Sequence, residues 1–111
     1  MKAVAVATDL MMVSRIAAAA ERAGVALQRV GSPQELPPPG EIDLVIVDWS
    51  EREPGWAETL SGWHAASPAR VVLFGRHTDL DAHRAAREAG LAPMWARSRL
   101  ISQLEGLLTP G

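Results

Sequence analysis

The chain has 111 residues, a formal net charge of −2 at neutral pH and no cysteine. This length suits one domain with a single core and two layers of helices over a sheet, and it leaves no room for an effector domain. The lack of cysteine excludes disulfides, thiol nucleophiles and thiolate metal sites, and the lack of a basic run leaves nucleic-acid binding without an electrostatic basis.

The amino-terminal segment superficially resembles a secretory signal, because an alanine-rich apolar stretch follows Lys2. Asp9 and Arg15 interrupt that stretch. No segment approaches the roughly eighteen uninterrupted apolar residues of a membrane span. We therefore expect a cytoplasmic protein that does not contact a membrane.

Apolar runs and helical spacing alternate from the start of the chain. Residues 3–7 are typical of a buried strand, and residues 10–23 form an alanine-rich helix with an apolar stripe. The more polar run at 25–30 indicates a strand nearer the edge of a sheet. Residues 32–36 fit only one helical turn, because the prolines at 37–39 end any helix there. The second helix should therefore be shortened or missing.

The run 43–48 is apolar without polar alternation and ends on a carboxylate. Such a run is typical of a strand that is buried on both faces, at the centre of a parallel sheet. Asp48 then lies at its carboxyl end, where open parallel sheets place their functional sites. Residues 56–66 follow with helical spacing.

The last third of the chain repeats the alternation. Residues 70–74 indicate a fourth buried strand and 80–89 a helix. The short run 91–96 contains a proline, which predicts a fifth strand at an edge. Ser98 is placed to cap a final helix over 99–108.

This alternation predicts an α/β fold of the flavodoxin-like type: a doubly wound, five-stranded parallel sheet in the order 2-1-3-4-5, in one domain over residues 1–111. The order places one set of residues along the edge where the strands end. They are Thr8, Asp9, Asp48, Gly75 and Arg97.

These residues resemble the site of a response-regulator receiver (CheY-like) domain, and the resemblance covers essentially the whole chain. Asp48 matches the phospho-acceptor aspartate of that family, and Asp9 matches the second member of its acidic pair. The segment Phe74-Gly75-Arg76-His77-Thr78-Asp79, followed by Arg97-Ser98, is similar to a divergent subset of small stand-alone receiver-like proteins. The resemblance implies a signalling module rather than an enzyme.

Three positions depart from the receiver pattern. Thr8 stands where the first acid should be, Gly75 replaces the switch hydroxyl, and Arg97 replaces the lysine. Magnesium assists phosphoryl transfer to a carboxylate and is usually held by one or two acids. With only Asp9 and Asp48 left, we expect weak magnesium binding at most, and no other cofactor.

Several side chains at this edge have more than one interpretation. Asp9 is as well placed to cap a helix as to bind a metal. His77, which with Gly75 occupies the switch-equivalent segment, is a candidate for anion binding or proton relay, or a solvated loop residue. Arg97 should pair with Asp48 at hydrogen-bonding distance, lower the pKa of that carboxyl and lock the site.

Three functions are consistent with these residues. We expect foremost a stand-alone receiver-like signalling module that acts by protein-protein interaction with little or no phosphorylation. The first alternative is an atypical response regulator receiver that is phosphorylated on Asp48. The second is a small anion- or ligand-binding domain that uses the strand-end edge.

The partner should be another protein, and we expect a homodimer. The predicted surface is the face made by residues 80–89, 91–96 and 99–108, with an exposed aromatic as anchor and charges of both signs beside it. Its residues are Arg84, Arg87, Met94 and Trp95. The competing interpretation is that Trp95 belongs to the core and that the charges are only solvated.

Overall fold

A computed structural model describes residues 1–109 of the chain. It contains a five-stranded parallel sheet in the order β2-β1-β3-β4-β5, which confirms the predicted order. The strands are β1 (Lys2–Val6), β2 (Ala26–Val30), β3 (Leu44–Asp48), β4 (Arg70–Gly75) and β5 (Trp95–Ala96).

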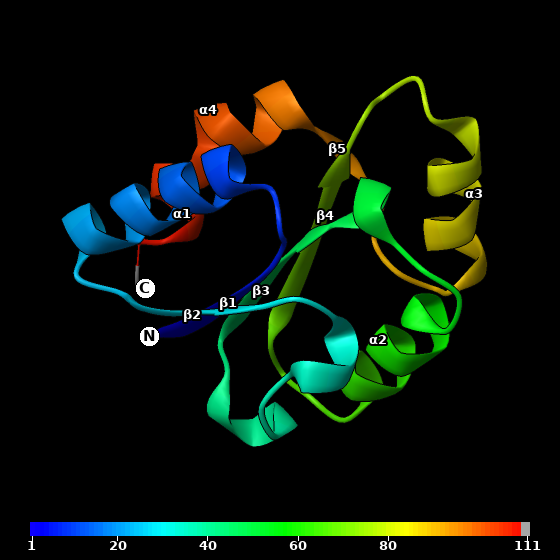
Figure 1. Ribbon diagram of the computed structural model, residues 1–111. Coiled ribbons are helices and arrows are strands. Elements are labelled where there is room, and N and C mark those ends of the chain that lie inside the picture. The colour runs from blue at the N-terminus through cyan, green and yellow to red at the C-terminus, as the bar shows by residue number, and fades with distance from the viewer. Residues whose placement is uncertain (110–111) are drawn as a thin grey trace.

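Helices cover both faces of the sheet. They are α1 (Leu10–Ala23), α2 (Trp56–Ala65), α3 (Leu80–Glu88) and α4 (Arg97–Leu107). Helices α1 and α4 lie together on one face, and α2 and α3 lie on the other (Figure 1). This arrangement is the predicted flavodoxin-like, doubly wound fold.

The core has two layers that meet at β3. Val45 and Val47 pack with the cluster under α2 and α3, while Leu44 and Ile46 pack with the cluster under α1 and α4. The continuous apolar run therefore serves both faces, as expected of a central parallel strand. Asp48 closes the strand and is the one charged residue among those described that is fully buried.

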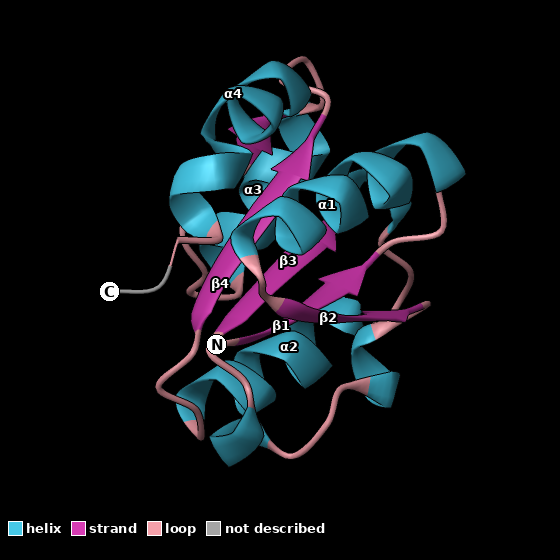
Figure 2. Ribbon diagram, turned by 90° about the vertical axis from the view of Figure 1, so that its left-hand side faces the viewer, coloured by secondary structure: helices cyan, strands magenta, loops and turns pink. Residues whose placement is uncertain are grey.

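The connection from β2 to β3 lacks a full helix, as predicted (Figure 2). Two short 3₁₀ turns, Pro33–Glu35 and Pro39–Glu41, replace it. The indole Nε1 of Trp63 on α2 donates to the carbonyl of Pro37 at 2.8 Å. Helix α2 thus satisfies part of the backbone that the prolines cannot pair within a helix.

Two local predictions at the end of the chain were wrong. The fifth strand was predicted over 91–96, but only Trp95 and Ala96 pair with β4; the N–H of Leu91 instead donates to Ala86 at the end of α3, and Pro93 has no N–H to give to the sheet. Helix α4 begins at Arg97, so Ser98 lies inside it and does not cap it.

Among residues 1–109 no helix is long and apolar enough to cross a membrane.

Candidate functional site

Asp48 lies at the end of β3 with none of its surface exposed. Its Oδ1 accepts two hydrogen bonds from Ser50, one from the hydroxyl at 2.6 Å and one from the backbone N–H at 3.2 Å. Its Oδ2 is buried and has no hydrogen-bond partner. Arg97 is the nearest cation, with Nη2 4.0 Å from Oδ2.

The pKa of Asp48 is raised above its ordinary value. Burial is the largest cause, and the negative charge of Glu51 adds to it; the Ser50 hydroxyl and, more weakly, the Arg97 guanidinium act in the opposite direction. The predicted pairing with Arg97 therefore requires correction. The ion pair is longer than a hydrogen bond, and it does not lower the pKa of Asp48 below its ordinary value.

Arg97 is the first residue of α4, and its Nε is buried without a hydrogen-bond partner. Its guanidinium is the group on which anion binding at the strand-end edge would depend. That alternative stays a prediction.

Glu51 is a third carboxylate at the site, and sequence analysis did not single it out. A single 3₁₀ turn, η3 (Trp49–Glu51), follows Asp48 and returns the Glu51 side chain toward β1. There it accepts hydrogen bonds from the Thr8 backbone N–H, at 3.0 Å, and from the Thr8 hydroxyl. The signal was its spacing of three residues after Asp48, which equals one 3₁₀ turn.

The pKa of Glu51 is lowered overall. Burial is the largest single cause and raises this pKa, but the hydroxyl and N–H of Thr8, together with the Asp48 carboxyl, act in the opposite direction and outweigh it. The two neighbouring carboxyls are therefore displaced in opposite directions. Asp48 holds its proton more tightly than an ordinary aspartic acid, and Glu51 holds its proton less tightly than an ordinary glutamic acid.

Asp9 caps helix α1. Its Oδ1 accepts from the N–H groups of Met11, at 2.9 Å, and Met12, at 3.4 Å. This is one of the two roles that the sequence left open for Asp9. Within residues 1–109 no group of three or more acidic, histidine or cysteine side chains is arranged to hold a metal ion. Weak magnesium binding by Asp9 and Asp48 stays a prediction, with Asp48 Oδ2 as the oxygen that no hydrogen bond occupies.

Gly75, at the switch-equivalent position, lies against two other residues. A Cβ built on it would be 2.8 Å from the sulfur of Met94 and 3.3 Å from the backbone nitrogen of Ser50. No side chain fits there without a shift of its neighbours. Met94 is only 5% exposed, so its prediction as a surface residue of the partner interface was wrong; the thioether fills the space beside Gly75.

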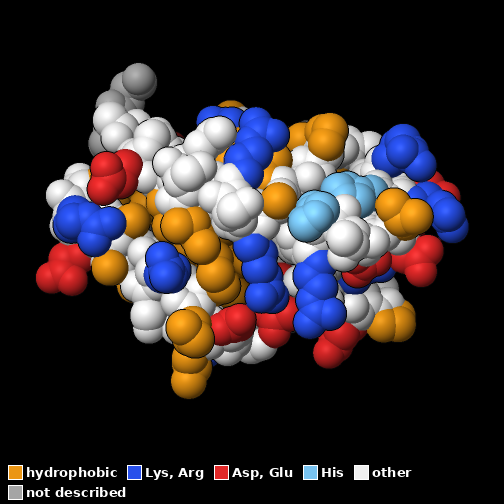
Figure 3. Space-filling view, turned by 90° about the horizontal axis from the view of Figure 1, so that it is seen from above, with side chains coloured by type: hydrophobic (Ala, Val, Ile, Leu, Met, Phe, Trp, Pro, Cys, Tyr) orange, Lys and Arg blue, Asp and Glu red, His pale blue; other side chains and the backbone are white. Residues whose placement is uncertain are grey.

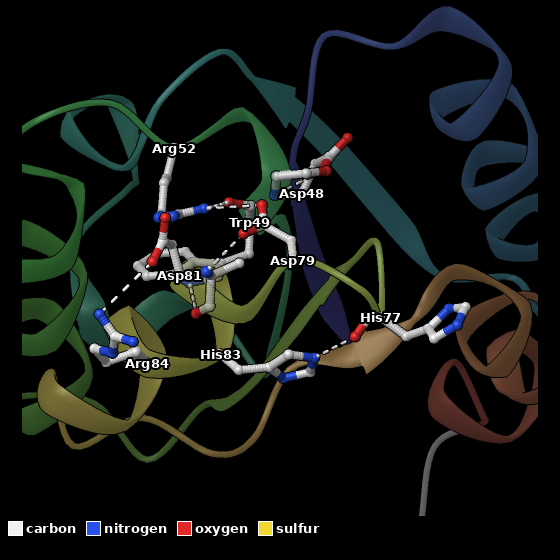
Figure 4. A network of polar contacts seen from close by, with 10 residues as sticks. Asp48, Trp49, Arg52, His77, Asp79, Asp81, His83 and Arg84 are labelled. Carbon is white, nitrogen blue, oxygen red and sulfur yellow. Dashed lines mark hydrogen bonds and ion pairs between the residues drawn. The ribbon is translucent and has the colours of Figure 1, made fainter.

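A polar network fastens η3 to α3 (Figure 4). The indole of Trp49 donates to the carbonyl of Ala82 at 2.9 Å. Arg52 donates to the carbonyl of Trp49 at 3.2 Å and lies 3.8 Å from Asp79, which caps α3. The loop that carries Ser50 and Glu51 is thereby held between β1 and α3.

His77 lies exposed in the loop between β4 and α3. Its carbonyl accepts from Nε2 of His83 at 2.9 Å, while no contact of its own ring is found among the described hydrogen bonds and ion pairs. This contact fixes the loop backbone rather than the His77 ring. Seen from above, the side toward which β4 runs in Figure 1, acidic, basic and histidine side chains are interspersed (Figure 3).

The other predicted interface residues lie where they were expected in the fold. Arg84 and Arg87 are exposed on α3, with Arg84 3.7 Å from Asp81. Trp95 is half-buried on β5, and the guanidinium of Arg99 covers its ring at 4.1 Å. Trp95 packs against the core cluster under α1 and α4, which supports the core interpretation in part; its contact with a partner stays a prediction.

No family model and no curated protein matches the chain. Solved structures do match it. A CheY-like response regulator receiver domain protein from Methanospirillum hungatei aligns at 15% identity and a TM-score of 0.71, covering 96% of this chain and 92% of that one. An orphan response regulator of H. pylori aligns at 16% identity and a TM-score of 0.69, covering 97% and 96%.

A third match differs in length. A response regulator from Burkholderia pseudomallei, whose structure holds a phosphorylated aspartic acid, a calcium ion and citrate, aligns at 13% identity and a TM-score of 0.74. The alignment covers 97% of this chain but 66% of that one. Together these matches show that the chain has the receiver fold.

Proposed function

We propose that this protein is a receiver-like signalling module that acts by binding another protein and accepts little or no phosphoryl group. The observation that carries the proposal is the state of Asp48. It occupies the position where phosphoryl acceptance would take place, yet it is fully buried and its Oδ1 is closed by two hydrogen bonds from Ser50.

Phosphoryl transfer to a carboxylate requires an ionised oxygen in line with the donor and a cation that neutralises the transferred group. The raised pKa of Asp48 opposes the first requirement. The engagement of Asp9 as a helix cap and of Glu51 with Thr8 works against the second, because Oδ1 of Asp9 and both carboxylate oxygens of Glu51 already accept hydrogen bonds. These contacts stabilise the site in its unphosphorylated form.

A signalling module that does not accept a phosphoryl group passes its signal on by binding another protein. We place the contact on the face of α3, β5 and α4, where α3 carries exposed arginines and β5 carries the half-buried Trp95. A homodimer is the simplest assembly, since α3 carries Arg87 and Glu88 side by side and a two-fold axis can bring each opposite the other. No turnover is proposed for this site.

The test is intact-mass measurement after incubation with acetyl phosphate and magnesium. We expect less than one tenth of the molecules to gain a phosphoryl group, with no difference between the native protein and Asp48→Asn. A receiver domain that is known to accept phosphate serves as the positive control. Stoichiometric labelling that Asp48→Asn abolishes would overturn the proposal in favour of an atypical, phosphorylated receiver.

A further inference from the structure

A groove of about 480 Å³ runs between α2 and α3, the two helices that cover one face of the sheet (Figure 1). Its floor consists of small side chains that are spaced one helical turn apart on each helix. They are Ala57 and Ser61 on α2, and Ala85 and Ala89 on α3. The three alanines pack against the core below and are only half-buried. The groove therefore presents an apolar surface that solvent can reach.

Polar contacts at both ends of the groove hold the two helices together. At one end, the hydroxyl of Ser61 on α2 donates to the carbonyl of Ala89, which follows α3, at 3.0 Å. At the other end, Arg52 precedes α2 and lies 3.8 Å from Asp79, the residue that caps α3 (Figure 4). These contacts fix the separation of the groove walls, so a partner does not have to spread the helices before it binds.

The charge along the groove is mainly negative. Glu58 on α2 and Glu88 on α3 line its two walls, and Glu53 lines a hollow of about 520 Å³ that continues the groove toward the start of both helices. All three side chains are exposed, and none has an ion-pair partner among residues 1–109. Arg52, the cation that lines the hollow, is already paired with Asp79. The groove is therefore complementary to a cationic partner.

From these features we infer that the groove between α2 and α3 is a docking site for an amphipathic helix of another protein, whose narrow apolar stripe is flanked on both edges by arginine or lysine. The inference rests on the proposed function, because it names the kind of protein partner that a signalling module of this kind would bind. It places that partner on the α2 side of α3, on a different surface from the predicted homodimer face.

The walls of the groove favour a helix over an extended peptide. Both walls are α-helices, whose backbone N–H and C=O groups pair within the helix. An extended peptide would find no backbone partners on either wall, whereas a bound helix pairs its own backbone groups. The small floor residues allow a third helix to approach closely and leave space for larger apolar side chains from the partner. Cations on the two edges of that helix would then face Glu58 and Glu88.

The experiment measures binding of a synthetic peptide to the full chain by fluorescence anisotropy. The probe is a capped peptide of about fourteen residues, or roughly four helical turns, with leucine and alanine on one face and arginine on both edges of that face. We expect saturable binding that weakens as the salt concentration rises. A peptide of the same composition in scrambled order keeps the charge but loses the apolar stripe, and it should bind about tenfold more weakly or worse.

Two kinds of variant test the charge and the shape of the groove separately. Glu58→Arg places a cation on the groove wall and should weaken binding by about tenfold or more. Glu21→Arg makes the same charge change at an exposed position of α1, on the opposite face of the sheet, and should change binding by less than about twofold. Ala85→Leu fills the groove without a change of charge and should weaken binding about as much as Glu58→Arg. If Ala85→Leu fails to fold, Ala57→Leu on the other wall takes its place.

Three results would overturn the inference. They are no saturable binding of the probe, equal binding of the scrambled peptide, and binding that Ala85→Leu leaves unchanged or that Glu58→Arg weakens no more than Glu21→Arg does. In the last two cases the probe is held by charge alone or at another surface. Failure of the docking site and failure of the proposed function are distinguishable, because phosphoryl labelling of Asp48 tests the second and peptide binding in the groove tests the first.

Discussion

At the scale of single residues, the sequence predicts where the site residues lie in the fold, but it does not predict the surroundings of their side chains. Asp48 could be located from the sequence because a central parallel strand ends on it, and Arg97 because it stands in the lysine position. The pKa shift of Asp48 depends first on burial and then on two residues whose roles appear only in the folded 3₁₀ turn. Ser50 caps the carboxyl and Glu51 places a second negative charge beside it.

These environments predict opposite effects of pH on stability. The pKa of Asp48 is raised above its ordinary 3.8, so the folded state binds the proton more tightly than the unfolded chain, and stability falls as pH rises from that value through the raised pKa. Asp48→Asn has no carboxyl to ionise and therefore does not lose this stability. As pH rises toward neutrality, we expect the free energy of unfolding of the variant to increase relative to that of the native protein, by about 1.4 kcal/mol for each unit by which the Asp48 pKa is raised.

Glu51→Gln provides the matched comparison. The pKa of Glu51 is lowered from 4.5. The stability that ionised Glu51 contributes to the folded protein is therefore fully present above that value, and it is lost as pH falls through the lowered pKa. The cost of Glu51→Gln should therefore shrink toward acid pH, while the gain from Asp48→Asn grows toward neutral pH. Urea unfolding of the three proteins between pH 3 and 7 measures both. Curves that stay parallel for Asp48→Asn would show that burial does not displace its titration.

At the scale of elements, local signals predicted helices and the proline-rich connection well. The bounds of α1 match the predicted 10–23, and prolines at 37–39 do end the helix that would have covered β2. The prediction failed at β5, where tertiary packing decides the structure. Leu91 and Met94 are drawn into the core, so the segment follows their burial and not the strand pattern.

Packing of Met94 on β4 makes Gly75 intolerant of even one methyl group. We expect Gly75→Ala to destabilise the protein by about 1–3 kcal/mol, because its Cβ would meet the sulfur at 2.8 Å. Met94→Ala should destabilise as well, since it leaves a cavity, by roughly 2–5 kcal/mol. The double variant should be less destabilised than the sum of the two, because the cavity accepts the new methyl group.

Gly62 is the matched control for this prediction. It lies inside α2 with nothing within 4 Å of its Cβ position, so Gly62→Ala should stabilise by roughly 0.5–1 kcal/mol through helix propensity. Urea unfolding midpoints of the four variants give the comparison. Additive effects of Gly75→Ala and Met94→Ala would mean that the two residues do not compete for the same space.

At the scale of the whole molecule, the strand order followed from chain alternation and the right-handedness of crossovers, and the structure confirms it. Function is less accessible at this scale. The receiver fold is shared with solved proteins at 13–16% identity, and a fold alone does not determine an activity. Only the chemistry of Asp48 and its neighbours separates a locked module from an active receiver.

The proposed homodimer is the last prediction and belongs to this scale. An isologous contact through α3 would set Arg87 of one copy against Glu88 of the other. We expect Arg87→Glu to weaken self-association at micromolar concentration by about tenfold, because it places like charges across the two-fold axis. The charge swap Arg87→Glu with Glu88→Arg should restore association, and Gln28→Glu, exposed on β2 at the sheet edge opposite β5, should leave it unchanged. Trp95→Ala should also weaken association, with circular dichroism confirming that the domain is still folded. Sedimentation velocity measures all four variants beside the native protein; a native protein that is monomeric over the whole concentration range would contradict the homodimer, because no charge pair then holds two copies together.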